Sequence, residues 1–319
     1  MADVYMHIRM TKDLIQLRQA DVEPSAAFLG AQFTDPMYYV TFHKDHKRYR
    51  RIADRTHDTN TRELLINVVN HVKTHPTDTN RSFLFGFLAH YALDVKLHPY
   101  VYHHVGIYQI DNPATHGWRG LHLKFERSID AVLYEQDTGK PSRFLRLTND
   151  FITTKRAHPD LKLLMQDVLG KQFAIEDGGD VFHTGVKHMY WVLRLLTTDR
   201  FGWKKALFRL VDVLVKSRYL FVADMSFYNH VEPYDFLNLE HRTWHHPVTN
   251  EPSNKSVPDL YDEAIAFANE LLDNTDKYLA GEAIDLSTVF TNLSLNSGVD
   301  CDRSKPFQYF HIYRPKNNS

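Results

Sequence analysis

One apolar segment, residues 80–98, constrains the fold of this chain most strongly, because three polar side chains interrupt it at regular spacing. His90, Asp94 and His98 lie four residues apart, close to one turn of an α-helix, so they share one face. Their neighbours are mostly phenylalanine, leucine and alanine, which favour a buried helix. An unpaired polar group in a protein core costs about 1–3 kcal/mol. The pattern therefore predicts a core helix whose polar row has a binding partner.

The rest of the chain has helical periodicity as well. Ser256 is suited to cap a helix at its N-terminus, and Asp78 or Thr79 is suited to cap the helix of the polar row. Pro99 is expected to end that helix just after His98, because the residue before a proline is driven out of helical conformation. The pattern predicts further helices at roughly 7–20, 43–54, 60–73, 119–135, 159–174, 181–197, 203–222 and 258–279.

The domain organisation follows from where this helical pattern stops. The sequence contains no glycine-rich phosphate loop, no internal repeat and no alternating strands joined by a hairpin turn, so we expect an all-α fold. Residues 233–257 form a polar loop with three prolines. We expect one multi-helix domain over residues 1–280, and a tail, 281–319, that docks on the same domain. Within the tail, FQYFHIYR is either a short strand or a docking segment.

Composition excludes several classes of protein. The 319 residues contain 38 Lys and Arg against 39 Asp and Glu, a net charge of −1, so no long nucleic acid is expected as partner. No apolar run approaches the ~18 residues of a membrane span, and the first residues do not resemble a secretory signal. The single cysteine, Cys301, excludes an intramolecular disulfide. These features favour a cytoplasmic protein and leave its oligomeric state open.

The polar row has the spacing of a metal site. Residues four apart rise about 6 Å along a helix, so His90 and Asp94 can bind one ion, while His98 lies about 12 Å from His90. Bonds from zinc to nitrogen or oxygen are only about 2.0–2.2 Å long. One ion therefore cannot reach all three side chains without strain. The row suits two ions better, with the two carboxylate oxygens of Asp94 as a bridge.

A second helical pair supports metal binding. His122 and Glu126 lie one turn apart in GLHLKFERSIDAVLY, another amphipathic segment. Further candidates upstream are His57 in RTHDTN, Asp35 in GAQFTDP and His7 near the start of the chain. All of these side chains offer nitrogen or oxygen, which favours zinc and leaves iron or manganese open.

These motifs resemble those of the zinc-dependent phospholipase C family, an all-helical group of phosphoester hydrolases. HYALDVKLHPY resembles the central His–x3–Asp segment with its following histidine, and HLKFERSID resembles the His–x3–Glu segment. FLGAQFTDPMYY, THDTN and MHIRMTKDLI resemble the stretches that supply an aspartate and two further histidines. The likeness is recognisable over about residues 5–130 and reaches 250 more loosely.

The resemblance implies a set of zinc ligands. The family pattern would place one zinc on His57, His90 and Asp94. It would place a second zinc on three residues from two helices: His98, His122 and Glu126.

The resemblance also implies a third ion and a residue that acts on water. His7 and a bridging Asp94 would contribute to the third ion, and Asp35 would orient or deprotonate the attacking water. Secreted members complete the third ion with the backbone of an N-terminal tryptophan, for which MADVYMH has no counterpart, so two or three zinc ions are expected. Those members also carry the later histidine where Tyr100 stands. His98 is the first choice for its role, with three substitutes: His103, His104 and His116.

The expected function is hydrolysis of a phosphodiester. Zinc ions that share a water molecule lower its pKa from about 15.7 toward about 7, and the resulting metal-bridged hydroxide can attack phosphorus. The resemblance implies phospholipase C-like activity on a small phosphoester or a phospholipid. Alternatives are a zinc nuclease or nucleotide phosphohydrolase on the same fold, and a non-catalytic metal-stabilised scaffold. An HD-type phosphohydrolase is a further alternative, because His57–Asp58 spells its central pair, but it would leave His122 and Glu126 unexplained.

Overall fold

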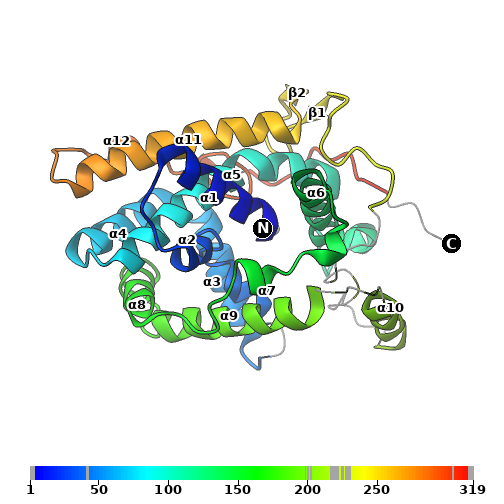
Figure 1. Ribbon diagram of the computed structural model, residues 1–319. Coiled ribbons are helices and arrows are strands. Elements are labelled where there is room, and N and C mark those ends of the chain that lie inside the picture. Colours follow the sequence, from blue (N-terminus) through cyan, green and yellow to red (C-terminus); the bar gives the residue numbers. More distant parts are fainter. Residues whose placement is uncertain are drawn as a thin grey trace.

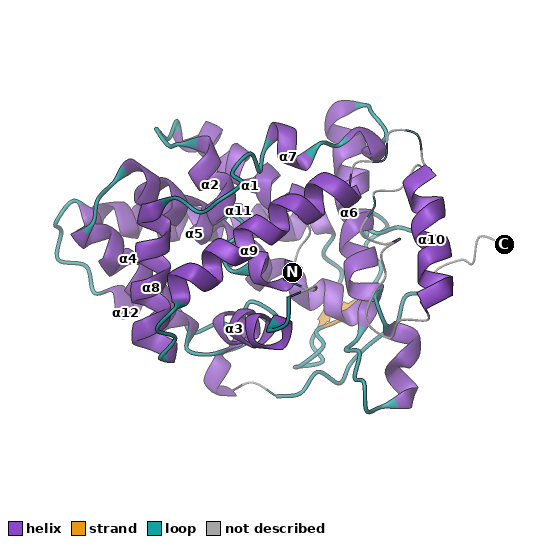
Figure 2. Ribbon diagram, turned by 90° about the horizontal axis from the view of Figure 1, so that it is seen from below, coloured by secondary structure: helices purple, strands orange, loops and turns teal. Residues whose placement is uncertain are grey.

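The computed structural model describes residues 4–40, 43–197, 199, 201, 203–215, 223, 226, 231–303 and 305–314. These residues form a bundle of helices that surround one central helix, α5 (Figure 1), and almost no strand (Figure 2). The expected all-α fold is confirmed. Its α-helices are α1 Val4–Arg18, α2 Pro24–Gly30, α3 His46–Asp58, α4 Thr61–Thr74, α5 Asp78–Val105, α6 Leu121–Thr138, α7 Leu147–Asp150, α8 Pro159–Phe173, α9 Gly178–Val192, α10 Trp203–Val215, α11 Val257–Leu279 and α12 Leu286–Val289.

Helix α5 is the core of the molecule because it is apolar on nearly every side. Its neighbours include α1, α2, α4, α6, α8 and α11. Two glycines let α2 approach it closely. A Cβ atom on Gly86 would lie 1.9 Å from the carbonyl oxygen of Ala27, and one on Gly30 would lie 2.0 Å from that of Phe83. This contact brings the end of α2, and the residues that follow it, against the polar row of α5.

The expected end of α5 at Pro99 is wrong, since the helix continues to Val105 and is terminated by Gly106 with φ of 62°. A proline inside a helix costs ~3 kcal/mol, because it removes one hydrogen bond and crowds the preceding turn. Burial of the side chains on both sides of Pro99 offsets this cost. The carbonyl of Val95, which loses its helical donor, faces the backbone of Gly298, where a Cβ would lie 2.6 Å away. Because α5 stays helical through Pro99, His98 remains on the same helix face as His90 and Asp94.

Other helix boundaries confirm or correct the sequence predictions. Ser256 caps α11 through a capping box with Asp259, as predicted, whereas Thr77 caps α5 in place of Asp78 or Thr79. The predicted helix 181–197 is α9 followed by a π-helical turn, Leu193–Thr197. The predicted helix 203–222 is α10 as far as Val215, and positions 216–222 lie outside the described residues. Sequence periodicity did not predict the short helices α2, α7 and α12.

The C-terminal part is mostly irregular. The polar loop 233–257 contains a two-residue ladder that was not expected, β1 Trp244–His245 paired antiparallel with β2 Pro252–Ser253. Residues 305–314 form no strand. Their backbone lies along the end of α5, where the amide of His311 donates to the carbonyl of His103 over 2.8 Å. Among the residues described, no helix has the length and apolar character needed to cross a membrane.

Candidate metal centre

The structure brings all eight predicted site residues together around the polar face of α5. Seven of these side chains are buried, and the side chain of His122 is the most accessible, with 28% of its surface exposed. Five elements supply them: His7 from α1, Asp35 from the 3-10 turn η1 (Asp35–Tyr39), His57 from α3, His90, Asp94 and His98 from α5, and His122 and Glu126 from α6.

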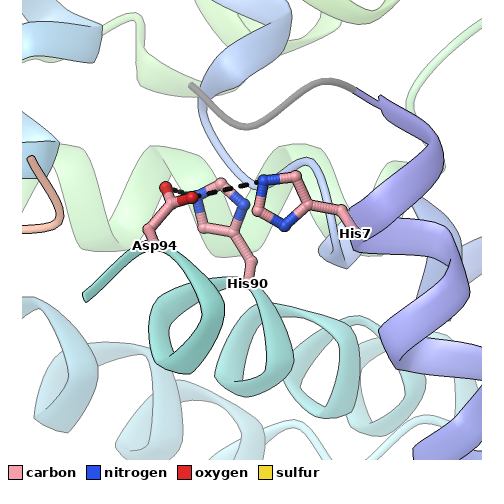
Figure 3. A group of neighbouring side chains, drawn as sticks. All are labelled: His7, His90 and Asp94. Atoms are coloured by element: carbon pink, nitrogen blue, oxygen red, sulfur yellow. Dashed lines mark ion pairs between the residues drawn. The ribbon is translucent and has the colours of Figure 1, made fainter. Parts of the chain in front are cut away.

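Asp94 lies at the centre of this cluster. Its Oδ1 is 3.3 Å from Nε2 of His7 and 3.6 Å from Nε2 of His98. Its Oδ2 is 3.2 Å from Nε2 of His90 and 4.0 Å from Nε2 of His57. Figure 3 shows the imidazoles of His7 and His90 directed at this carboxylate from α1 and α5. Each carboxylate oxygen therefore faces two imidazole nitrogens, an arrangement suited to a bridge between ions.

The ligand atoms fall into two neighbouring groups. The inner group is His7, Asp35, His57, His90 and Asp94. It contains two sets of three in which all ligand atoms lie within 4.8 Å of one another, and His90 belongs to both sets: His7 with His90 and Asp94, and Asp35 with His57 and His90.

The outer group is His98, His122 and Glu126, and its ligand atoms also lie within 4.8 Å of one another. Oε1 of Glu126 is 3.3 Å from Nε2 of His98 and 2.9 Å from Nε2 of His122. This triple is the one that the family resemblance implies. In the inner group, His57 lies 3.1 Å from Asp35 and 4.0 Å from Asp94, so its imidazole faces both carboxylates.

Backbone carbonyls fix the orientation of three imidazoles. Nδ1 of His57 lies 2.7 Å from the carbonyl oxygen of Ala53, Nδ1 of His90 lies 3.0 Å from that of Ala31, and Nδ1 of His98 lies 2.6 Å from that of Leu295. A ring that donates Nδ1–H to a carbonyl presents the lone pair of Nε2 on its other side, as metal-binding histidines do. All three lone pairs therefore point into the cluster.

These inward atoms fit a bound cation. The three Nε2 atoms and both carboxylate oxygens of Asp94 are buried, and they have no hydrogen-bond partner among the described residues. A lone pair that faces a carboxylate oxygen at 3.2 Å is repulsive unless a positive charge lies between them. Nitrogen and carboxylate ligands in this number are those that zinc prefers. The type, number and direction of these donor atoms therefore fit a zinc site.

The protonation states suit metal binding as well. Burial acts to raise the pKa of Asp94, but the neighbouring His98, His90 and His7 outweigh it and hold the pKa well below its usual range. The pKa of Asp35 is lowered in the same way, since its contact with His57 outweighs burial. Burial lowers the pKa of His90 to about 4. At neutral pH the two carboxylates are therefore ionised and His90 is neutral, which are the forms that bind metal.

His98 is the later histidine that reaches the cluster. Because α5 continues as a helix beyond it, His98 stays on the face of Asp94. The hydroxyl of Tyr100, on another face, donates to the carbonyl of Phe236 over 3.0 Å. The three substitutes contact other groups: His103 the carbonyl oxygen of Tyr309, His104 the ring of Phe125, and His116 the carbonyl oxygen of Ile110.

One supporting residue of the site does have a signal in the sequence. Asp130 lies one turn after Glu126, and its carboxylate accepts hydrogen bonds from the backbone amides of Tyr5 and Met6 over 2.7 and 2.9 Å. It thereby fixes the first turn of α1, which carries His7. The spacing His–x3–Glu–x3–Asp places Asp130 on the same helix face as His122 and Glu126, but the sequence alone assigned it no role. The carbonyls that orient the imidazoles have no comparable signal.

Fold and site together define a helical protein with a buried centre suited to several divalent metal ions. A family model described as zinc dependent phospholipase C matches residues 6–179, more than half of the 319 residues, and the chain belongs to this family. Comparison with curated proteins finds no match, and comparison with solved structures finds none either. The matched region contains all eight predicted site residues and ends well before Leu295, whose carbonyl orients His98.

Proposed function

We propose that this protein is a zinc-dependent phosphoester hydrolase of the phospholipase C type. The observation that carries the proposal is the set of buried imidazole lone pairs directed at the ionised carboxylate of Asp94. Membership of the zinc-dependent phospholipase C family supports the same conclusion. A buried cluster with this much uncompensated negative charge and this many lone pairs is stable when cations occupy it.

The inner and outer groups have separate roles in this proposal. The inner group would hold one or two ions, with Asp94 as a shared ligand, and the outer group would hold one more. Zinc bound there would lower the pKa of a coordinated water and polarise the phosphoryl oxygens of a substrate. His122 is the most accessible member, so substrate would approach the centre from the side of the outer group.

Asp35 is the residue that we propose acts on the attacking water. Its Oδ1 lies 3.1 Å from Nε2 of His57, so the two side chains are placed to face the same ion. Its lowered pKa keeps it ionised and able to accept a hydrogen bond at neutral pH. Asp35 would orient the water and accept its proton as the new bond to phosphorus forms.

The substrate class is a small phosphoester or a phospholipid. The net charge of −1 does not favour a long polyanion as substrate. The ring of Tyr102, whose centroid lies 4.8 Å from that of His122, forms an aromatic wall beside the outer group. A flat wall of this kind can contact the group that leaves with the phosphate.

Two chromogenic substrates test the proposed function. The protein, purified without chelator, is assayed with p-nitrophenyl phosphorylcholine and with bis-p-nitrophenyl phosphate, before and after chelation and after zinc is restored. We expect chelator-sensitive turnover that zinc recovers, with preference for the phosphorylcholine ester. Turnover of the bis ester alone would favour the nuclease alternative. Bound zinc without hydrolysis of either ester would favour the scaffold and overturn the proposal.

A further inference from the structure

Asp58 follows a predicted metal ligand directly in sequence, yet its carboxylate belongs to another part of the structure. It lies at the C-terminus of α3, next to His57. Its Oδ1 accepts a hydrogen bond from the hydroxyl of Ser294 over 2.5 Å, and its Oδ2 accepts one from the side-chain amide of Asn296 over 2.6 Å. Both carboxylate oxygens therefore bind one C-terminal turn, 236 and 238 residues away in sequence.

This turn, residues 294–298, is closed by its own hydrogen bonds. Oγ of Ser294 accepts from the backbone amides of Asn296 and Ser297 over 3.1 and 3.0 Å, and the carbonyl of Ser294 accepts from the amide of Gly298 over 2.8 Å. Gly298 has φ of 65° and lies against the carbonyl of Val95 in α5. The turn is thus a defined structure held between α3 and α5.

Leu295, inside this turn, connects the two groups of the metal centre. Its amide donates to the backbone carbonyl of His57 over 2.8 Å, and its carbonyl accepts from Nδ1 of His98 over 2.6 Å. The second bond decides which nitrogen of His98 carries the proton, and so keeps the Nε2 lone pair directed at the outer group. One residue therefore ties the backbone of α3 to the ring of an α5 ligand.

Asn296 extends the same support to His122. Its side-chain oxygen accepts from the hydroxyl of Tyr102 over 3.0 Å, while its amide nitrogen donates to Asp58. The ring of Tyr102 packs against both histidines of the outer group, with its centroid 5.9 Å from that of His98 and 4.8 Å from that of His122. Both histidines of the outer group therefore contact groups that depend on Asp58: His98 contacts the carbonyl of Leu295, and both rings contact Tyr102.

We propose that Asp58 is a positioning residue for the outer zinc, although it contacts none of the outer ligands itself. It fixes the turn 294–298, the turn fixes the rings of His98 and Tyr102, and those rings shape the outer group. Loss of such support around a metal ligand weakens metal binding about 10–100-fold. The proposal rests on the zinc centre of the proposed function, but it concerns binding of metal and does not require that the protein be catalytic.

The test compares zinc binding by Asp58→Ala with that of the wild type in competition titrations against a chromophoric chelator. His122→Ala identifies which binding step belongs to the outer group. We expect Asp58→Ala to weaken that step about 10–100-fold and to leave the inner steps unchanged. The control is Asp302→Asn, which removes the same charge from an exposed position nearby, and wild-type binding is expected.

A swapped pair separates positioning from a general effect on folding. In Asp58→Asn/Asn296→Asp, the new amide can donate to the new carboxylate, which can still accept from Tyr102. We expect Asp58→Asn alone to weaken the outer step and the swap to restore it. Equal weakening of all steps, or no rescue by the swap, would overturn the positioning role. A wild-type protein that binds no zinc would instead overturn the proposed function itself, so the two failures are distinguishable.

Discussion

The inner and outer groups of the centre differ in what orients their histidines. In the inner group, His57 donates to the carbonyl of Ala53, one turn earlier in its own helix α3, and His90 donates to that of Ala31, directly after α2. In the outer group, His98 donates to Leu295, which is 197 residues away and lies beyond the region matched by the family model. The inner group is fully buried, whereas the outer group reaches the surface at His122.

This difference suggests a division of roles. An enclosed group with local supports is suited to hold metal tightly, and a group that reaches the surface is suited to meet substrate. The outer group also depends on a C-terminal segment that lies outside the region matched by the family model. If the division is right, changes to the shared ligand, to the outer group and to the C-terminal part have effects of decreasing size.

The largest effect is expected from Asp94→Asn, because Asp94 faces histidines of both groups. The variant loses one carboxylate oxygen and the charge that attracts metal, so zinc content should fall by at least two ions per chain. Elemental analysis of the purified protein measures this. With chelator present, the variant should be no less stable than the wild type, because an uncompensated buried charge has been removed. Full zinc content would contradict a bridging Asp94.

His122→Ala should have a smaller and more local effect. Only the outer group loses a ligand, so zinc content should fall by one ion while the inner ions remain. Native mass spectrometry resolves such a difference. Loss of all ions together would show that the two groups are one cooperative site, and the distinction drawn between them would be wrong.

Removal of metal from the wild type should lower its thermal stability. A ligand that binds only the folded state stabilises it by about 2.7 kcal/mol at 100 times its Kd. With an unfolding entropy of about 2.1 cal/mol/K per residue, a chain of 319 residues should lose about 4 °C in melting temperature on chelation. Differential scanning calorimetry with and without chelator measures the change, and an unchanged melting temperature would contradict metal binding in the core.

A last effect, independent of metal, concerns the end of α5, outside both groups. Burial lowers the pKa of His104 to about 3, whereas an unfolded histidine titrates near 6.5. Between these values the unfolded state binds one more proton, so the free energy of unfolding falls by about 1.4 kcal/mol per unit decrease in pH.

The variant His104→Phe should lose this part of the pH dependence, measured by urea unfolding between pH 7 and pH 4 in chelator. Burial also lowers the pKa of His103 and of His90 to about 4, so some dependence on pH remains in the variant. An identical slope in wild type and variant would show that His104 is not held neutral by the fold.

The positions of the candidate ligands could be predicted from the sequence better than the groups that orient them. His90, Asp94 and His98 could be placed on one face because helical spacing alone fixes their direction, and His98 remained there because α5 passes through Pro99. The orienting carbonyls could not be predicted, because backbone oxygens have no sequence signature. Helices as short as α7 show no periodicity, and the contact between Asp58 and Ser294 joins distant segments that no local pattern relates.

The count of zinc ions on the wild-type protein tests the central claim, a multinuclear zinc centre around Asp94, most directly. The protein is purified without chelator or histidine tag, and its metals are identified and counted by elemental analysis and native mass spectrometry. The account predicts two or three zinc ions per chain. A folded protein that holds none, even after zinc is supplied, would contradict it. The polar face of α5 would then be a network of protonated, hydrogen-bonded side chains that binds no metal.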